Sequence, residues 1–230
     1  MLHYWLVMPA AGAGQRFGGA LPKQHAPLGA ATVLESSLQL FVEDQRCRGV
    51  LLALAEHDAQ RAALALRLPA KVRIVSGGAQ RCASVLCGLA ALAGQAQDDD
   101  WVLVHDAVRP CLSRADLDRL LDAGAAARSG ALLAAPVADT VKHADEQQCV
   151  ERTVSREQLW RALTPQMFRY RRLYSALTQA QQAAREPTDE AQAIEWLGER
   201  PLLVAAAHSN IKVTTAEDLA VAAAILAARE

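Results

Sequence analysis

A loop of small residues followed by two cations carries the clearest chemical signal in this sequence. Residues 9–14 read Pro-Ala-Ala-Gly-Ala-Gly, directly after an apolar run at 6–8 that predicts a buried strand. A loop with so little side chain lets a ligand approach the backbone and turns N–H groups toward an anion. Arg16 and Lys23 follow, and no acidic residue precedes Glu35. The stretch therefore predicts a polyphosphate site with Arg16 and Lys23 as its cations.

The spacing of this loop differs from the common nucleotide-binding motifs. The P-loop pattern G-x-x-x-x-G-K-[ST] is absent, and Gly12-Ala13-Gly14 reaches Gly18 one residue too late for G-x-G-x-x-G. This spacing and the arginine in the turn argue against the interpretation of the chain as a Rossmann dehydrogenase. They favour a site for phosphate chemistry. Taken alone, the loop is also compatible with a glycine-rich strand-to-helix turn whose charges are solvated.

A candidate metal ligand, Asp106, stands just beyond the apolar run at 101–104. Mg²⁺ keeps several waters and takes other ligands from substrate phosphates, so a lone carboxylate can hold it. The alternative is an ion pair between Asp106 and Arg109 that shapes the turn, and both can hold together. The neighbouring His105 is interpreted as structural rather than as a catalytic base.

A second small-residue segment, Ser76-Gly77-Gly78-Ala79-Gln80-Arg81, leaves the predicted strand at 72–75 and enters a helix. Its exposed backbone could contact the edge of a nucleobase, and Ser84, one turn into the helix, could add a side-chain partner. An ordinary surface loop is the alternative interpretation.

Two more cations, Arg156 and Lys212, stand at the ends of predicted elements. Singly, such a residue is usually a solvated surface charge. Together with Arg16 and Lys23, they would form a pocket of four cations, enough for two phosphate-bearing substrates.

The elements that must position these residues alternate between strand and helix. This alternation predicts one α/β domain over 1–230, with a mostly parallel twisted sheet covered by helices on both faces. Ligands of such sheets bind beyond the carboxyl ends of the strands. The strand candidates are 6–8, 49–54, 72–75, 101–104, 131–135 and 202–205, and the helix candidates are 33–42, 58–66, 80–93, 114–127, 191–196 and 216–228.

Residues 139–155 interrupt this pattern with β-formers at both ends of a polar middle. They predict a β-hairpin arm that projects from the body and reaches a partner subunit, with a mobile surface loop as the alternative. The segment 169–185 is rich in Gln and Arg and predicts an exposed helix.

Composition narrows the class of protein. The net charge of -1 and the aromatic content of 4% argue against a nucleic-acid binder. Five scattered cysteines without a C-x-x-C pair predict reduced thiols in a cytoplasmic protein. No apolar run reaches the length of a membrane span, and the N-terminus lacks the pattern of a secretory signal. We therefore expect neither a transmembrane helix nor secretion.

Seven blocks of this sequence resemble, in order, the motifs of the 2-C-methyl-D-erythritol 4-phosphate cytidylyltransferase family. The resemblance covers nearly the whole chain and implies a Rossmann-like nucleotidyltransferase domain that uses CTP, 2-C-methyl-D-erythritol 4-phosphate and Mg²⁺. The blocks are PAAGAGQRFG, PKQ, VHDAVRP, APVADTVK, LWRALTPQMF, TDEA and NIKVTTAEDL.

The resemblance also implies a role for each site residue. Arg16 and Lys23 match the pair that stabilises the negative transition state, and Arg156 and Lys212 match the pair that orients the acceptor phosphate. Asp106 matches the acid on the Mg²⁺ side. The acceptor is further contacted at Arg109, Thr140 and Thr164, with a weaker match at Thr188 and Asp189; the nucleotide is contacted at Pro9, Ala10, Ala11, Gly12, Ala13, Gly14, Gly77, Gly78, Ser84, Asp106 and Ala107.

The same resemblance implies how the base is selected and how the subunits pair. Backbone carbonyls in the two small-residue loops would accept from the cytosine amino group, which uracil lacks. The arm matches a hairpin that interlocks two subunits, so the resemblance implies a homodimer with Arg156 near the subunit boundary. The sequence departs from the family pattern at two positions that bear on the details of nucleotide binding. Ala79 stands where many members have an acidic residue, and His25 stands where many have a tyrosine.

Other functions compete with this interpretation. A ribitol-5-phosphate cytidylyltransferase would use the same scaffold and CTP loop, and assays with both acceptors would separate the two. A non-catalytic nucleotide-binding or regulatory module would be expected to lose some of the four cations, yet all four are present.

Overall fold

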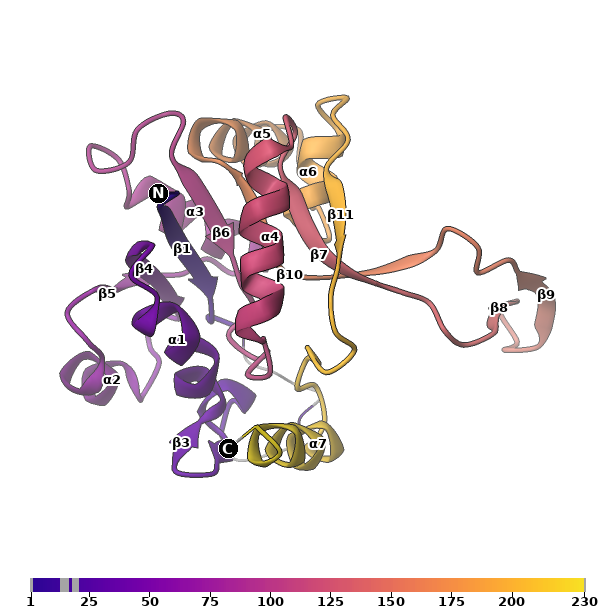
Figure 1. Cartoon of the computed structure of the whole chain (residues 1–230), viewed down its shortest axis with the longest axis horizontal. Coiled ribbons are helices and arrows are strands. Elements are labelled where there is room, and N and C mark those ends of the chain that lie inside the picture. Colours follow the sequence, from indigo (N-terminus) through magenta and orange to yellow (C-terminus); the bar gives the residue numbers. More distant parts are fainter. Residues whose placement is uncertain (1, 13–16, 18–20, 230) are drawn as a thin grey trace.

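A seven-stranded sheet organises the part of the chain that the computed structural model describes, residues 2–12, 17 and 21–229. The strand order is β11-β7-β10-β6-β1-β4-β5 (Figure 1). All neighbouring strands pair in parallel except β10, which is antiparallel to β6 and to β7. The bounds are β1 Tyr4–Pro9, β4 Cys47–Leu54, β5 Val72–Ser76, β6 Trp101–Val104, β7 Ala131–Pro136, β10 Trp160–Arg169 and β11 Leu202–Ala205.

Helices cover both faces of this sheet, as the alternation predicts. Helices α1 and α4 pack on one face, and α3, α5 and α6 pack on the other. Helix α7 lies at the carboxyl end of the sheet with the short hairpin β2–β3 (Pro27–Leu28 and Ala31–Thr32). The bounds are α1 Val33–Glu43, α2 Arg61–Arg67, α3 Arg81–Ala90, α4 Arg114–Ala126, α5 Tyr170–Gln182, α6 Glu190–Glu195 and α7 Ala216–Ala227.

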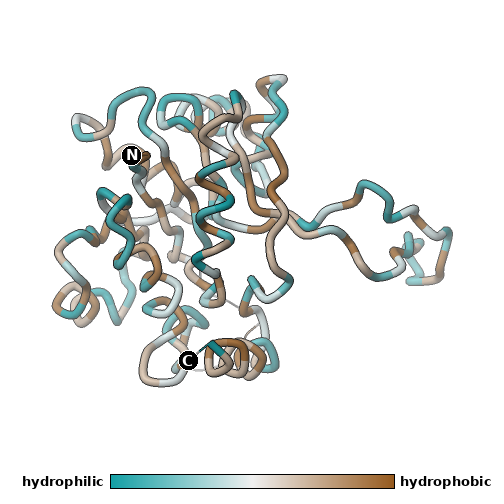
Figure 2. Tube along the Cα trace, viewed as in Figure 1, coloured by the Kyte–Doolittle hydropathy of each residue, from teal (hydrophilic) through white to brown (hydrophobic). Residues whose placement is uncertain are grey.

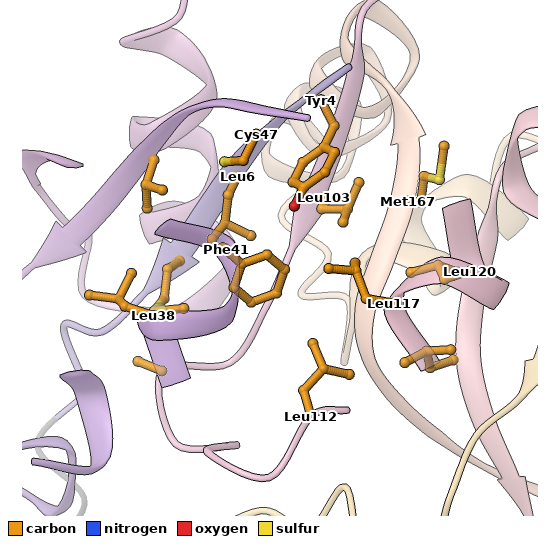
Figure 3. Packing of buried hydrophobic residues seen from close by; sticks show 14 of the residues in the cluster. Tyr4, Leu6, Leu38, Phe41, Cys47, Leu103, Leu112, Leu117, Leu120 and Met167 are labelled. Atoms are coloured by element: carbon orange, nitrogen blue, oxygen red, sulfur yellow. The ribbon is translucent and has the colours of Figure 1, made fainter. Parts of the chain in front are cut away.

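Successive side chains of the central strands point to opposite faces of the sheet, so the core has two layers. In β1, Leu6 and Met8 face α1 and α4, whereas Val7 faces α3. Figure 3 shows the first layer, where the ring of Phe41 lies among aliphatic side chains from the sheet and from α4. Figure 2 shows hydrophobic residues gathered in the central strands. The carboxyl edge of the sheet is therefore supported by a packed core on both sides.

The predicted elements are present, but the structure differs from the prediction in the added hairpin β2–β3, in the added strand β10 and in the burial of α5. Strand β10 has no counterpart among the predicted strands, because Pro165 and a register shift between Ala162 and Gln166 interrupt its alternation. Helix α5 was expected to be exposed, yet Leu173 and Leu177 on one of its faces are fully buried against the sheet. The predicted helix is therefore present, but only one of its faces is exposed and the other packs on the sheet.

The segment 139–155 forms a hairpin of β8 (Val141–Ala144) and β9 (Val150–Val154), as predicted. It extends β7 and β10 away from the body of the molecule (Figure 1). Most of its residues are exposed. A thin two-stranded ribbon has little core of its own, so its stability depends on the strands that carry it.

None of the helices in the described residues is long and apolar enough to span a membrane. All five cysteines lie in the described part of the chain and are free thiols, as predicted.

Candidate active site

A cavity of about 160 Å³ opens where β1, β5 and β6 end. Since the carboxyl ends of parallel strands meet at one edge of a sheet, segments distant in the sequence converge there. The walls contain most of the nucleotide-binding residues predicted from the sequence. They are Pro9, Ala10, Ala11, Gly12, Lys23, Gln24, Gly78, Ala79, Gln80, Arg81, Ser84, Asp106, Ala107, Val108 and Lys212.

Gln24 holds the first small-residue loop in place. Its amide nitrogen Nε2 donates to the carbonyl oxygens of Ala10 at 3.0 Å and Gly12 at 3.3 Å. The side chain is only 4% exposed, so these bonds are shielded from water. No role was predicted for Gln24 from the sequence, although the PKQ block places it beside Lys23.

Lys23 lies in the short 3-10 helix η2 (Lys23–His25), in the wall of the cavity. The other end of this turn is tied to the β4–α2 connection, where His25 Nε2 lies 2.8 Å from Asp58 Oδ2. Both side chains of that pair are buried, with exposures of 4% and 5%. His25, one of the two departures from the family pattern, thus anchors the turn that carries Lys23.

The second small-residue loop packs directly against the first. A Cβ on Gly77 would lie 2.6 Å from Cβ of Ala11, so only glycine permits this approach. Ser84 Oγ accepts from the backbone N–H of Gly78 at 3.1 Å and lies 3.0 Å from the carbonyl oxygen of Gln80. The hydroxyl of Ser84 therefore holds the loop in shape, and Ser84 also lines the cavity.

Asp106 lines the cavity and contacts three cations, two of which, Arg81 and Lys212, line the same cavity. Its Oδ1 is 3.0 Å from Arg81 Nε, and its Oδ2 is 2.9 Å from Lys212 Nζ and 3.6 Å from Arg109 Nε. The predicted Asp106–Arg109 pair is thus present, as part of a larger cluster. Burial alone would raise the pKa of Asp106, but Arg81, Lys212 and Arg109 hold it well below its usual range. Asp106 is therefore ionised at neutral pH.

Arg81 is a site residue that was not predicted from the sequence. Besides Asp106, it binds Glu190 with two hydrogen bonds, Nη1 to Oε1 at 2.6 Å and Nη2 to Oε2 at 3.0 Å. Glu190 is 1% exposed and opens α6, far from Arg81 in the sequence. A planar guanidinium fixed at both ends is well suited to orient Asp106.

His105 has a structural place, as predicted. Its Nε2 lies 3.2 Å from the carbonyl of Arg109, and its Nδ1 lies 3.0 Å from Thr164 Oγ1, which accepts from the backbone N–H of Asp106 at 3.0 Å. These partners assign the proton to Nε2 of a neutral ring. Burial lowers the pKa of His105 to about 4.

We predict that this buried ring makes folding sensitive to mild acid. An unfolded histidine titrates near pH ~6.5, so the stability from keeping His105 neutral is present above that pH and lost as the pH falls toward the folded pKa of about 4. The expected loss is up to about 3 kcal/mol in the free energy of unfolding. Urea unfolding of wild type and His105→Asn across this pH range measures it: the variant should show a flatter dependence, and equal slopes would contradict the assignment.

Two further cavities lie next to the first, and they are lined by only part of the predicted acceptor-side residues. Thr164, Arg109 and Lys212 line one of them, together with Thr188 and Asp189. Asn210, for which the sequence predicted no role, joins this group: its Nδ2 donates to the carbonyl of Thr164 at 2.9 Å, and its own backbone carbonyl accepts from Arg109 Nη1 at 2.8 Å.

The other predicted residues fall elsewhere. Arg156 and Thr140 lie on the arm, and neither lines a cavity described above. Arg156 donates to the carbonyl of Ala138 at the base of the arm. Ala13, Gly14 and Arg16 lie outside the described residues.

The donor set for a metal ion is small. Among the described residues, no group of three or more His, Cys, Asp or Glu side chains could hold a metal. Asp106 offers one ionised carboxylate at the cavity. Such a set fits only an ion that takes most of its ligands from phosphates and water, which is the habit of Mg²⁺.

A family model described as 2-C-methyl-D-erythritol 4-phosphate cytidylyltransferase matches residues 4–228. The chain belongs to this family. A cytidylyltransferase of that description from Halorhodospira halophila is 50% identical over all of this chain and 96% of its own length. One from Xanthomonas euvesicatoria is 49% identical over 94% of this chain and 82% of its own length.

Solved structures of the cytidylyltransferase family share the fold. The crystal structure of a 4-diphosphocytidyl-2C-methyl-D-erythritol synthase aligns with a TM-score of 0.86 and 35% identity, over 98% of this chain and 99% of that one. The Francisella tularensis 2-C-methyl-D-erythritol 4-phosphate cytidylyltransferase aligns with a TM-score of 0.83 and 30% identity, over 97% and 99%. The resemblance stated from seven sequence blocks is confirmed for the whole chain, and so is the single α/β fold.

Proposed function

We propose that this chain transfers a cytidylyl group from CTP to 2-C-methyl-D-erythritol 4-phosphate, a step of non-mevalonate isoprenoid precursor synthesis. An oxygen of the acceptor phosphate attacks the α-phosphorus of CTP, the bond from that phosphorus to the bridging oxygen of the β-phosphate breaks, and pyrophosphate leaves. The products are CDP-methylerythritol and pyrophosphate. The family membership of the chain supports this reaction over transfer to ribitol 5-phosphate and over a purely regulatory role.

The observation that carries the proposal is the position of Lys212. Its side chain lines the nucleotide cavity and both neighbouring cavities, while its Nζ contacts Asp106 at 2.9 Å. An ammonium group at the junction of two phosphate-binding spaces stabilises the charge that builds when two anions are brought together. Lys212 therefore orients the acceptor phosphate toward the α-phosphorus.

The other roles follow from the walls of the cavity. Lys23 and Arg16 bind the triphosphate and stabilise its developing charge, and the small-residue loops position the nucleotide through their backbone. Carbonyls of these loops accept from the cytosine amino group, and UTP would leave such an acceptor unpaired. Little covalent chemistry falls to the protein in a transfer of this kind, so positioning and electrostatics supply the rate.

Mg²⁺ is the cofactor of the proposed reaction. Asp106 would hold it, with the remaining ligands from CTP phosphates and water. The bound ion would neutralise part of the charge on the triphosphate. Arg81 and Glu190 would keep the Asp106 carboxylate directed toward it.

The arm is proposed to join two copies of the chain in a homodimer, with Thr140 and Arg156 near the acceptor site of the partner. The exposed, two-stranded form of the arm supports this proposal, because such a ribbon is marginally stable unless it packs on something. A cytoplasmic location stays a prediction that rests on the five free thiols.

We expect Arg156→Ala to weaken use of the acceptor more than use of CTP. Losing one charged contact with a phosphate should raise the KM of the acceptor about tenfold and leave the KM of CTP nearly unchanged. Steady-state kinetics with each substrate varied in turn would measure both constants. Arg152→Ala, also on the exposed arm, is the matched control. An unchanged acceptor KM in the Arg156 variant would remove this residue from the site.

The reaction itself is tested by pyrophosphate release from purified protein with CTP, Mg²⁺ and 2-C-methyl-D-erythritol 4-phosphate. Parallel reactions replace the acceptor with ribitol 5-phosphate, or CTP with UTP or ATP. Release that requires both CTP and the methylerythritol substrate supports the proposal. A preference for ribitol 5-phosphate, or no release with either acceptor, would overturn it.

A further inference from the structure

A third cavity, of about 340 Å³, continues from Arg109 and Lys212 away from the nucleotide. Strand β10 contributes Arg161 to its wall, and the segment after β11 contributes His208 and Asn210. Neither Arg161 nor His208 belongs to the cluster around Asp106. The cavity therefore extends the acceptor side of the site with an unassigned arginine.

A neighbouring histidine holds Arg161 at this cavity. Arg161 lies in β10 opposite Ala135 of β7, three residues before Thr164. Its Nη2 is 3.2 Å from His208 Nδ1. Because a guanidinium can only donate, Nδ1 must accept and carries no proton in this contact. His208 thus restrains Arg161 without neutralising its charge.

The charge around this cavity is positive. The cations Arg109, Arg161 and Lys212 line it, and Asp106, which lies outside its wall, pairs with Lys212 and Arg109 but not with Arg161. Within the described residues, Asp218 is the one acid in the wall, and its Oδ2 already accepts from the backbone N–H groups of Thr214 and Thr215, at 2.8 Å and 2.9 Å. Arg109 is 8% exposed, and its Nε has no hydrogen-bond partner in the described part of the chain. Such a lining is suited to a small dianion.

We propose that Arg161 is a further substrate-binding residue, whose guanidinium binds the phosphate group of the acceptor together with Lys212. This inference rests on the proposed function and deepens it. A guanidinium presents donors in a fixed fork that matches two phosphate oxygens, whereas the Lys212 ammonium acts as a point charge. Arg161 belongs to the same chain as Lys23 and Lys212, so its contact with the acceptor phosphate would add to the one proposed for Arg156 on the arm.

Arg161→Ala tests this inference, because the residue is exposed and its loss leaves no cavity in the core. The acceptor KM should rise about tenfold, the size expected when a charged hydrogen bond is lost. The KM of CTP and the thermal stability should stay the same. Arg161→Lys should recover part of the loss, since it restores the charge without the fork. Arg171→Ala removes an arginine whose side chain is 75% exposed and pairs with Asp98, and serves as the control.

Inhibition by inorganic phosphate separates a phosphate contact from a hydroxyl contact. Phosphate should compete with the acceptor in the wild type, and its inhibition constant should rise in Arg161→Ala by about the same factor as the acceptor KM. Unchanged values of both constants, or an equal rise in the KM of CTP, would overturn the inference. If the wild type releases no pyrophosphate with this acceptor, the proposed function fails; if it does and Arg161→Ala matches it, only this inference fails.

Discussion

Lys23→Ala is expected to lower kcat/KM for CTP about a hundredfold while leaving the fold intact, a loss of roughly 3 kcal/mol of transition-state stabilisation. The lysine lies in the cavity wall, and its turn is anchored by Gln24 on one side and by the buried His25–Asp58 pair on the other. Those anchors remain in the variant, so the turn should keep its place. Pyrophosphate release at varied CTP concentration measures the loss.

Lys142→Ala on the exposed arm is the matched control, since it also removes one lysine but from outside the three cavities. Its kinetics toward CTP should equal those of the wild type. Thermal unfolding of both variants should give wild-type midpoints. Wild-type turnover of CTP by Lys23→Ala would exclude Lys23 from the transition state.

Asp106→Asn should reduce both activity and stability. The substitution keeps the shape of the side chain but leaves Arg81, Lys212 and Arg109 around a neutral group. Removing one partner of a buried ion pair typically costs about 3 to 5 kcal/mol. Lys212 is 40% exposed and can turn toward water, so we expect the lower end, about 3 kcal/mol in the free energy of unfolding. Activity should fall by about two orders of magnitude because the carboxylate proposed to hold Mg²⁺ is lost.

Urea unfolding and pyrophosphate release measure the two effects of Asp106→Asn separately. Asp98→Asn is the control, because Asp98 also pairs with an arginine but its side chain is 61% exposed. Exposed pairs contribute about 0 to 1 kcal/mol, so the control should barely change. An Asp106 variant as stable and active as the control would show that the cluster has no role.

Much of the fold could be predicted because the local signals agree with one another. The apolar run before Pro9, predicted as a strand, forms β1. The capping box of Thr215 and Asp218 begins α7, close to where a helix was predicted. Where the alternation of β10 breaks at Pro165, no local pattern marks a strand. Only pairing with its two neighbours, β6 and β7, makes this segment an antiparallel strand of the sheet.

The candidate site could be predicted where short blocks carry the chemistry, and less well where distant residues meet. Asp106 and Lys212 stand in two of the recognised sequence blocks. In the fold, Asp106 Oδ2 lies 2.9 Å from Lys212 Nζ. The contact between Arg81 and Glu190 joins residues whose types alone suggest solvated surface charges. The role of Gln24 could not be predicted either. It consists of two hydrogen bonds to backbone carbonyls that come within reach of Gln24 only in the folded loop.

Lys212 is proposed to stand between two phosphate-bearing substrates, with Lys23 on the nucleotide side. A crystal structure of the chain with CTP, Mg²⁺ and a non-reacting acceptor analogue tests it most directly. We predict Lys23 Nζ on the triphosphate and Lys212 Nζ on the acceptor phosphate, each at about 3 Å, with an acceptor oxygen about 3 to 3.5 Å from the α-phosphorus. An acceptor phosphate bound in a cavity that excludes Lys212 would contradict this placement of Lys212.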